Sequence, residues 1–213
     1  MTVVLLHAFP LDERMWERQV RLLPDALAPR LYGRGPTMDA WAESLAAEID
    51  GELTVVGASM GGYCALALAR RVPDRVRRLL LVGARADADS DERRAARAET
   101  IALIRREGPE GLWRSMRPKL YADEAHADER LLFRDPDLLI AAVEAIRDRA
   151  DSREVARLLG SRLRFVVGER DSFVSPDELR DHDVRVLRGV GHLANLEAPD
   201  AFDAELREFV DDG

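Results

Sequence analysis

Cysteine is almost absent from this chain of 213 residues, in which Cys64 is the only one. A single cysteine excludes an internal disulfide and any metal site built from several cysteines. Histidine is also scarce, and no His, Asp and Glu residues follow one another at the spacing of metal ligands. The sequence therefore predicts no metal site and no cofactor. Cys64 lies in an Ala/Leu-rich helical stretch, which predicts a small buried thiol.

Long apolar runs and an excess of positive charge are missing too. No run approaches the ~20 apolar residues of a membrane span, and no basic segment of a secretion signal opens the sequence. The 32 basic residues, of which only Lys119 is a lysine, are outnumbered by 40 acidic ones. The resulting formal charge of −8 argues against nucleic acid and anionic membranes as partners. We therefore predict a cytoplasmic protein, and the sequence carries no signal for its oligomeric state.

Short apolar runs alternate with helical patterns along the chain. The apolar runs predict strands at residues 2–7, 26–31, 53–56, 76–82, 163–167 and 184–187. Helical spacing predicts helices at residues 15–23, 38–50, 63–70 and 200–210. This alternation predicts an α/β fold of about six mainly parallel strands, with helices on both faces, in a single domain over residues 1–213. Residues 86–160, rich in Arg, Ala, Glu and Asp, predict a helical cap inserted after the fourth strand.

A serine joins one of these strands to the helix that follows it. Ser59 lies in a Gly-x-Ser-x-Gly pattern between Gly57 and Gly61. A serine on so sharp a turn is held in a strained backbone conformation, while the glycines let the flanking backbones approach. The side chain then projects above the sheet, over the N-terminus of the next helix, where negative charge is stabilised. We therefore interpret Ser59 as a nucleophile and the chain as an enzyme.

A serine nucleophile requires a base, and the base requires an acid to orient it. In a parallel sheet both are expected just after the carboxyl ends of strands. Asp171 follows the strand at 163–167 and Gly168, and His192 follows the strand at 184–187 and a pair of glycines. The chain order of Ser59, Asp171 and His192 is that of one known class of serine hydrolase. These three residues are the predicted catalytic triad.

A tetrahedral oxyanion needs hydrogen-bond donors that are already in place. Backbone N–H groups provide them without reorganisation. The N–H of Met60, directly after the nucleophile, is one candidate, and the N–H of Phe9, after the first strand, is the other. His7, at the end of that strand, is predicted to make a structural hydrogen bond instead of taking part in catalysis.

Taken together, these motifs resemble those of the α/β-hydrolase superfamily, and most closely its small carboxylesterase, enol-lactonase and cofactor-free haloperoxidase-like members. The resemblance covers nearly the whole chain outside the inserted helices. It rests on the segments His7–Pro10, Met15–Trp16, Gly33–Gly35, Gly57–Gly62, Gly168–Asp171 and Gly191–Pro199.

The resemblance implies an α/β-hydrolase fold with a Ser-His-Asp triad and a helical cap over the site. It also implies that the N-terminal hairpin of these relatives is missing, which leaves residues 26–31 as the edge strand. Pro29 and Arg30 fit such an edge, because both oppose further strand pairing. Some relatives carry the acid after the preceding strand, so Asp87 and Asp89 are alternatives to Asp171.

The predicted activity is the hydrolysis of carboxylic esters of small, mainly apolar substrates through an acyl-enzyme. Alternatives are an enol-lactone hydrolase, a perhydrolase-like activity, or a slowly turning-over ligand-binding module on the same fold. The pocket is predicted to be apolar, without an anion clamp. Its expected lining residues are Leu11, Trp113, Phe133, Phe173 and Leu193, and the arginines at 93–94 and 105–106 are expected on solvated helix faces.

Overall fold

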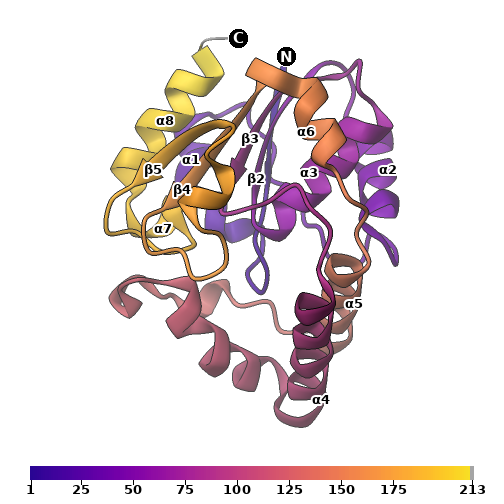
Figure 1. Ribbon diagram of the computed structural model, residues 1–213, viewed down its shortest axis with the longest axis vertical. Coiled ribbons are helices and arrows are strands. Elements are labelled where there is room, and N and C mark those ends of the chain that lie inside the picture. Colours follow the sequence, from indigo (N-terminus) through magenta and orange to yellow (C-terminus); the bar gives the residue numbers. More distant parts are fainter. Residues whose placement is uncertain (212–213) are drawn as a thin grey trace.

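Five parallel strands form the centre of the molecule (Figure 1). The computed structural model describes residues 1–211. The strands pair in chain order and are β1 (Thr2–Leu6), β2 (Leu53–Ala58), β3 (Val76–Val82), β4 (Leu163–Gly168) and β5 (Asp183–Leu187). All neighbouring pairs are parallel, and every residue of β2 and β4 is buried. Largely apolar runs form such strands because helices cover both faces of the sheet. The predicted parallel α/β sheet is confirmed.

The predicted strand at residues 26–31 is not formed. In its place, Leu27 makes an isolated parallel bridge to Val4 and hydrogen bonds to the backbones of Val3 and Leu5 (2.9 and 2.7 Å). Pro29 has no N–H group with which to continue this ladder. Within residues 1–211 the sheet thus has five strands where we expected six, and the helical insertion follows its third strand.

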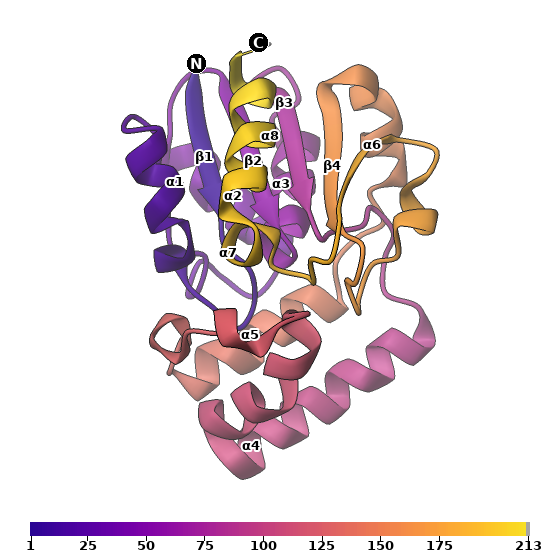
Figure 2. The same cartoon turned by 90° about the vertical axis from the view of Figure 1, so that its left-hand side faces the viewer.

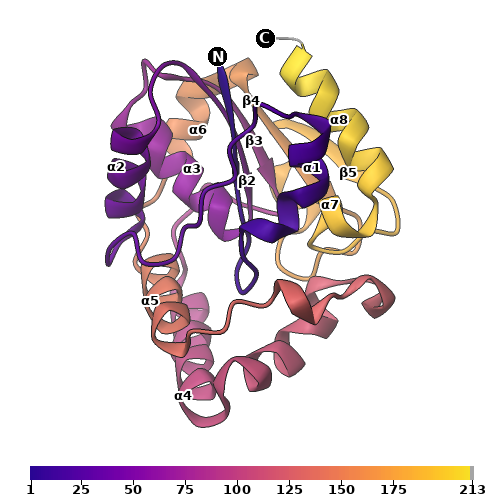
Figure 3. The ribbon, with the colours of Figure 1, turned by 180° about the vertical axis from the view of Figure 1, so that it is seen from behind.

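Helices cover the two faces of the sheet (Figure 3). On one face lie α2 (Met38–Glu48), α3 (Met60–Arg71) and α6 (Arg153–Leu159), and on the other lie α1 (Glu17–Leu22), α7 (Ala194–Glu197) and α8 (Pro199–Asp211). Alternate strand residues point to opposite faces, so two buried clusters form. Leu79 and Leu81 of β3 belong to the first cluster, whereas Leu80 and Val82 pack with Phe202 in the second.

Two of the helices inserted between β3 and β4 lie beyond the carboxyl ends of the strands (Figures 1 and 2). They are α4 (Asp91–Leu120) and α5 (Pro136–Arg147), which pack on each other, with the 3-10 turns η2 (Glu124–His126) and η3 (Glu129–Leu131) between them. Gly108 bends α4 with a φ of 69°, and Pro109 after it has no N–H for the preceding turn. The helix therefore has two arms that run in different directions (Figure 2).

Three further 3-10 turns complete the described elements: η1 (Glu13–Trp16), η4 (Gly160–Arg162) and η5 (Pro176–Leu179). The predicted helix at 15–23 is thus a 3-10 turn followed by α1. No helix in residues 1–211 is both long and apolar enough to cross a bilayer. Cys64 is buried in α3, and burial raises the pKa of its thiol to about 12.

His7 connects the end of β1 to the segment beside it. Its Nε2 atom accepts a hydrogen bond from the backbone N–H of Leu31 (3.0 Å), so the proton of the neutral ring is on Nδ1, which faces the carbonyl oxygen of Ala8 (3.3 Å). The side chain is fully buried, and burial lowers the pKa of His7 from 6.5 to about 4. His7 therefore has the structural role that we predicted.

The lowered pKa of His7 makes stability depend on pH. Between pH 6.5 and about 4, the unfolded state binds a proton that the folded state does not, so stability falls as the pH falls. We expect His7 alone to remove about 3 kcal/mol of unfolding free energy across this interval. Urea denaturation from about pH 7 to about pH 4 measures this slope. The dependence of unfolding free energy on pH should weaken in His7→Gln. It should persist in the control His126→Gln, which changes an exposed histidine. Equal slopes in both variants would contradict the lowered pKa of His7.

Candidate active site

The turn between β2 and α3 holds Ser59 in a strained conformation. Its φ of 49° and ψ of −111° make it the one non-glycine residue with a positive φ within residues 1–211. Such a conformation costs on the order of 1–3 kcal/mol and persists only where the surroundings enforce it. A Cβ atom added to Gly61 would lie 2.2 Å from the carbonyl oxygen of Leu6, and one added to Gly57 would lie 2.5 Å from the carbonyl oxygen of Gly61. The two glycines are therefore required by the close packing of this turn.

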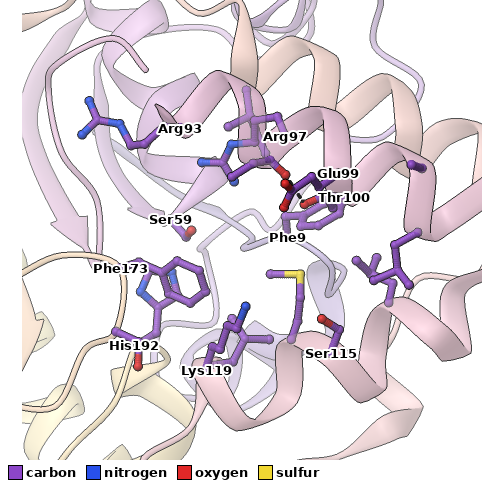
Figure 4. A pocket seen from close by; sticks show the side chains of 18 of the residues that line it. Phe9, Ser59, Arg93, Arg97, Glu99, Thr100, Ser115, Lys119, Phe173 and His192 are labelled. Atoms are coloured by element: carbon purple, nitrogen blue, oxygen red, sulfur yellow. Dashed lines mark hydrogen bonds between the residues drawn. The ribbon is translucent and has the colours of Figure 1, made fainter. Parts of the chain in front are cut away.

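Ser59 lies at the wall of a cavity of about 730 Å³ (Figure 4). His192 and Phe173 line the same cavity. Although Ser59 occupies the N-cap position of α3, its hydroxyl forms no capping hydrogen bond in the described part of the chain. The hydroxyl therefore stays available to the cavity, above the positive end of the α3 helix dipole.

Asp171 and His192 come together at the ends of β4 and β5. The Nδ1 atom of His192 lies 2.8 Å from Oδ2 and 2.9 Å from Oδ1 of Asp171, and the two side chains are only 3% and 0% exposed. Oδ1 also accepts hydrogen bonds from the backbone N–H groups of Phe173 (2.8 Å) and Val174 (3.1 Å). Burial by itself raises the pKa of Asp171, but His192 and the two N–H donors outweigh it and lower that pKa below its ordinary value. Asp171 is thus an ionised partner that fixes the orientation of the imidazole.

The two alternative acids have other partners. The buried carboxylate of Asp89 accepts hydrogen bonds from Arg149 (2.6 Å) and Arg97 (3.0 Å), and Asp87 is bonded to Arg93. Both are held in a cluster of arginines. Of the three candidates, Asp171 is the one that lies against His192.

Glu197 joins the loop of His192 to the end of α4. Its Oε1 atom accepts from the N–H of Gly191 (2.9 Å), and its Oε2 atom accepts from the N–H of Ala122 (2.8 Å). Beside it, the N–H of His192 donates to the carbonyl oxygen of Leu120 (3.0 Å). No local pattern in the sequence marks this link, because Glu197 and Ala122 are 75 positions apart.

Two backbone N–H groups near Ser59 have no acceptor among residues 1–211. They belong to Phe9, in the turn after β1, and to Met60, the first residue of α3. Phe9 also lines the cavity. An N–H group without a protein acceptor at the start of a helix attracts negative charge. Both are the donors predicted from the sequence for an oxyanion.

The predicted pocket residues are mostly placed elsewhere. Phe173 does line the cavity, and its ring centroid lies 4.6 Å from that of His192. Leu11, Trp113 and Leu193 are instead buried in the cluster on the α8 face of the sheet, and Phe133 stacks on a tyrosine outside the cavity lining. The prediction was wrong for these four residues, because it used closeness in sequence to the motifs, whereas the direction of each side chain decides the lining.

Both arms of α4 face the cavity and bring cations to it (Figure 4). Its lining residues recur every three or four positions, as on one face of a helix. The cationic members are Arg93, Arg97, Arg106 and Lys119, and Arg85 joins them from the segment before α4. The expected apolar lining is thus joined by five cationic side chains, and Arg93 and Arg106, which we expected on solvated helix faces, also border the cavity.

The chain is similar to known proteins over most of its length. The sequence model of the Alpha/beta hydrolase family matches residues 3–205. A pimeloyl-[acyl-carrier protein] methyl ester esterase of Aromatoleum aromaticum is 41% identical over 90 residues, which are 38% of this chain and 36% of that protein. The chain thus matches about a third of that relative's length. A protein of the same name from Neisseria meningitidis serogroup B (strain H44/76) is 28% identical over an alignment of 247 positions that covers 99% of this chain and 93% of that protein.

Among solved structures, an esterase from Thermogutta terrifontis with malate bound superposes with a TM-score of 0.88 at 30% identity. The match covers 100% of this chain and 90% of that one. These names agree with the predicted class of enzyme, a carboxylic ester hydrolase, and the predicted resemblance is confirmed. With a family match over nearly its whole length and the strand-to-helix serine turn in place, this chain belongs to the alpha/beta hydrolase family.

Proposed function

We propose that the chain hydrolyses carboxylic esters through a triad of Ser59, His192 and Asp171. The observation that carries the proposal is the contact of the His192 imidazole with Asp171 in the cavity that also exposes the strained Ser59. With Nδ1 bound to the carboxylate, Nε2 of His192 is the nitrogen left to act as a base. It takes the Ser59 proton as the hydroxyl oxygen attacks the ester carbonyl, and Asp171 stabilises the imidazolium that forms.

The two free N–H groups, of Phe9 and Met60, hold the oxyanion of the tetrahedral intermediate. They need no reorganisation, because the turns that carry them are already formed. Collapse of the intermediate breaks the ester C–O bond, and the alcohol leaves with the proton from His192. Water then attacks the acyl-enzyme with His192 again as base, releases the acid and restores Ser59.

The inserted helices act as the cap of the single domain. Within residues 86–160, α4 and α5 supply the part of the cavity wall that faces the strand ends. Glu197 holds the end of α4 to the His192 loop. The names of the two curated relatives support alkyl esters of carboxylic acids as substrates. The substrate is a small molecule, and water is the second reactant.

Hydrolysis of p-nitrophenyl esters from acetate to decanoate tests this function. We expect turnover with an optimum at short or medium chain length, and labelling of Ser59 by a fluorophosphonate. Labelling without turnover would favour the enol-lactonase or perhydrolase alternative. Lactones, and a carboxylic acid with peroxide, would then be assayed as substrates. Neither turnover nor labelling would contradict the hydrolase proposal and favour a ligand-binding module.

A further inference from the structure

The cavity is rich in positive charge, and most of that charge is already paired. Its lining includes five cationic side chains and one carboxylate, that of Glu99. Arg85 pairs with Glu178 (2.8 Å), which is outside the lining, and Arg106 pairs with Glu107 (2.7 Å). Asp89 is shared by Arg149 (2.6 Å), Arg97 (3.0 Å) and Arg93 (3.3 Å). Within residues 1–211, Asp87 is the only other acid that pairs with these three arginines. Two carboxylates therefore face three guanidinium groups, and this wall keeps an excess of positive charge.

Lys119 differs from these arginines. It is the only lysine in the chain and forms no ion pair or hydrogen bond within residues 1–211. It lies on the second arm of α4, next to Leu120, whose carbonyl oxygen accepts from the backbone of His192. Figure 4 shows its amine directed into the cavity from the side that carries His192. An ammonium group with three unused donors therefore lies in the wall of the proposed active site.

We infer that Lys119 selects ester substrates that carry a second, negatively charged group, such as the free carboxylate of a dicarboxylic acid monoester. This inference rests on the proposed ester hydrolysis. Lys119 supplies a charge-assisted hydrogen bond to the distal carboxylate, and the charge excess around Asp89 adds a favourable field. Apolar side chains of the lining, Met116 and Leu103 among them, pack against the methylene chain between the two groups.

This chemistry favours a substrate with a distal carboxylate over a purely apolar one. A neutral acyl chain leaves the Lys119 ammonium without a partner, whereas a carboxylate at its end replaces the water that the ammonium otherwise binds. Lys119 is exposed, so its contribution is screened by solvent and is smaller than that of a buried pair. We therefore expect a preference of about fivefold per charge instead of an absolute requirement.

The test compares monomethyl and dimethyl esters of the same dicarboxylic acid, which differ in one charge. Succinate, adipate and suberate vary the distance between the two groups. For the wild type, kcat/KM for the monomethyl ester should exceed that for the dimethyl ester at one or more chain lengths, and the ratio should fall as salt is added. Lys119→Met should lower the monomethyl value about fivefold and leave the dimethyl value within twofold, and Lys119→Glu should reverse the preference.

Arg105→Met is the matched control. It removes one positive charge from an exposed position of α4 that does not line the cavity. Three outcomes would overturn the inference while ester hydrolysis itself stands. The first is a similar loss of kcat/KM for the monomethyl ester in Arg105→Met, and the second is an equal loss on both esters in Lys119→Met. The third is a wild-type preference for the dimethyl ester. If the proposed hydrolysis itself fails, no ester will be turned over. The binding of adipate to the wild type and to Lys119→Met can then still be compared by NMR titration. Weaker binding to the variant supports the anion site at Lys119, and equal binding overturns it.

Discussion

Replacing Ser59 with alanine is expected to lower kcat for ester hydrolysis by a factor of about 10⁶. The loss is this large because the hydroxyl oxygen forms the covalent bond of the acyl-enzyme, and neither the imidazole nor the oxyanion donors can act without it. The variant should fold as the wild type does. Alanine keeps the Cβ at position 59, and the hydroxyl forms no capping hydrogen bond within residues 1–211.

Two other serines line the same cavity and serve as controls for this variant. Ser115→Ala and Ser172→Ala remove a hydroxyl from the same wall, and both should keep kcat within about tenfold of the wild type. Initial rates on the best p-nitrophenyl ester, with intact-mass detection of the fluorophosphonate adduct, measure the effect. Activity in Ser59→Ala above about 1% of the wild type would mean that another group is the nucleophile.

The contact between Asp171 and His192 could be predicted because it follows from a simple rule of the fold. Ser59, Asp171 and His192 each follow the carboxyl end of a strand, and parallel pairing gathers these ends at one edge of the sheet. The rule places Asp171 and His192 on neighbouring strands, where the structure has them 2.8 Å apart. The choice between Asp171 and the two earlier aspartates needed the structure, because it depends on which arginines pack beside Asp87 and Asp89.

The edge of the sheet was predicted only in part. A run of apolar residues at 26–31 has the composition of a strand, but Pro29 has no backbone N–H to donate to a ladder. A central strand would have excluded that proline, and an edge position tolerates it at the cost of the ladder beyond Leu27. Residues 26–31 were therefore predicted correctly as the segment beside β1, but wrongly as a sixth strand.

The cavity lining could not be read from the sequence because it depends on the rotation and bend of one helix. Leu112 faces the cavity, whereas the adjacent Trp113 points away and packs edge-on against Tyr121. The change of direction at Gly108 brings the second arm, with Lys119, to the side of His192. A glycine followed by proline marks a bend in any sequence, but the direction of the bend is set by packing on α5 and the strand ends.

Replacing Asp171 with asparagine is expected to lower kcat by a factor of about 10⁴, by analogy with other serine triads. The amide oxygen can still accept the N–H groups of Phe173 and Val174, so the loop should keep its shape. What is lost is the negative charge that stabilises the imidazolium. The amide N–H₂ also donates where the carboxylate accepted, so it favours the imidazole tautomer whose Nε2 carries the proton and cannot act as a base.

Asp87→Asn is the matched control for this variant. It makes the same change in a carboxylate that lies among arginines near the cavity, and it should leave kcat within about tenfold. A normal rate in Asp171→Asn with a collapse in Asp87→Asn would transfer the role of the acid to the earlier strand. The distance from Nδ1 of His192 to the carboxylate oxygens of Asp171, 2.8 and 2.9 Å, argues for the opposite result. If His192 is the base, the charge that supports it has to come from the carboxylate that touches its other nitrogen, and Asp171 is that carboxylate.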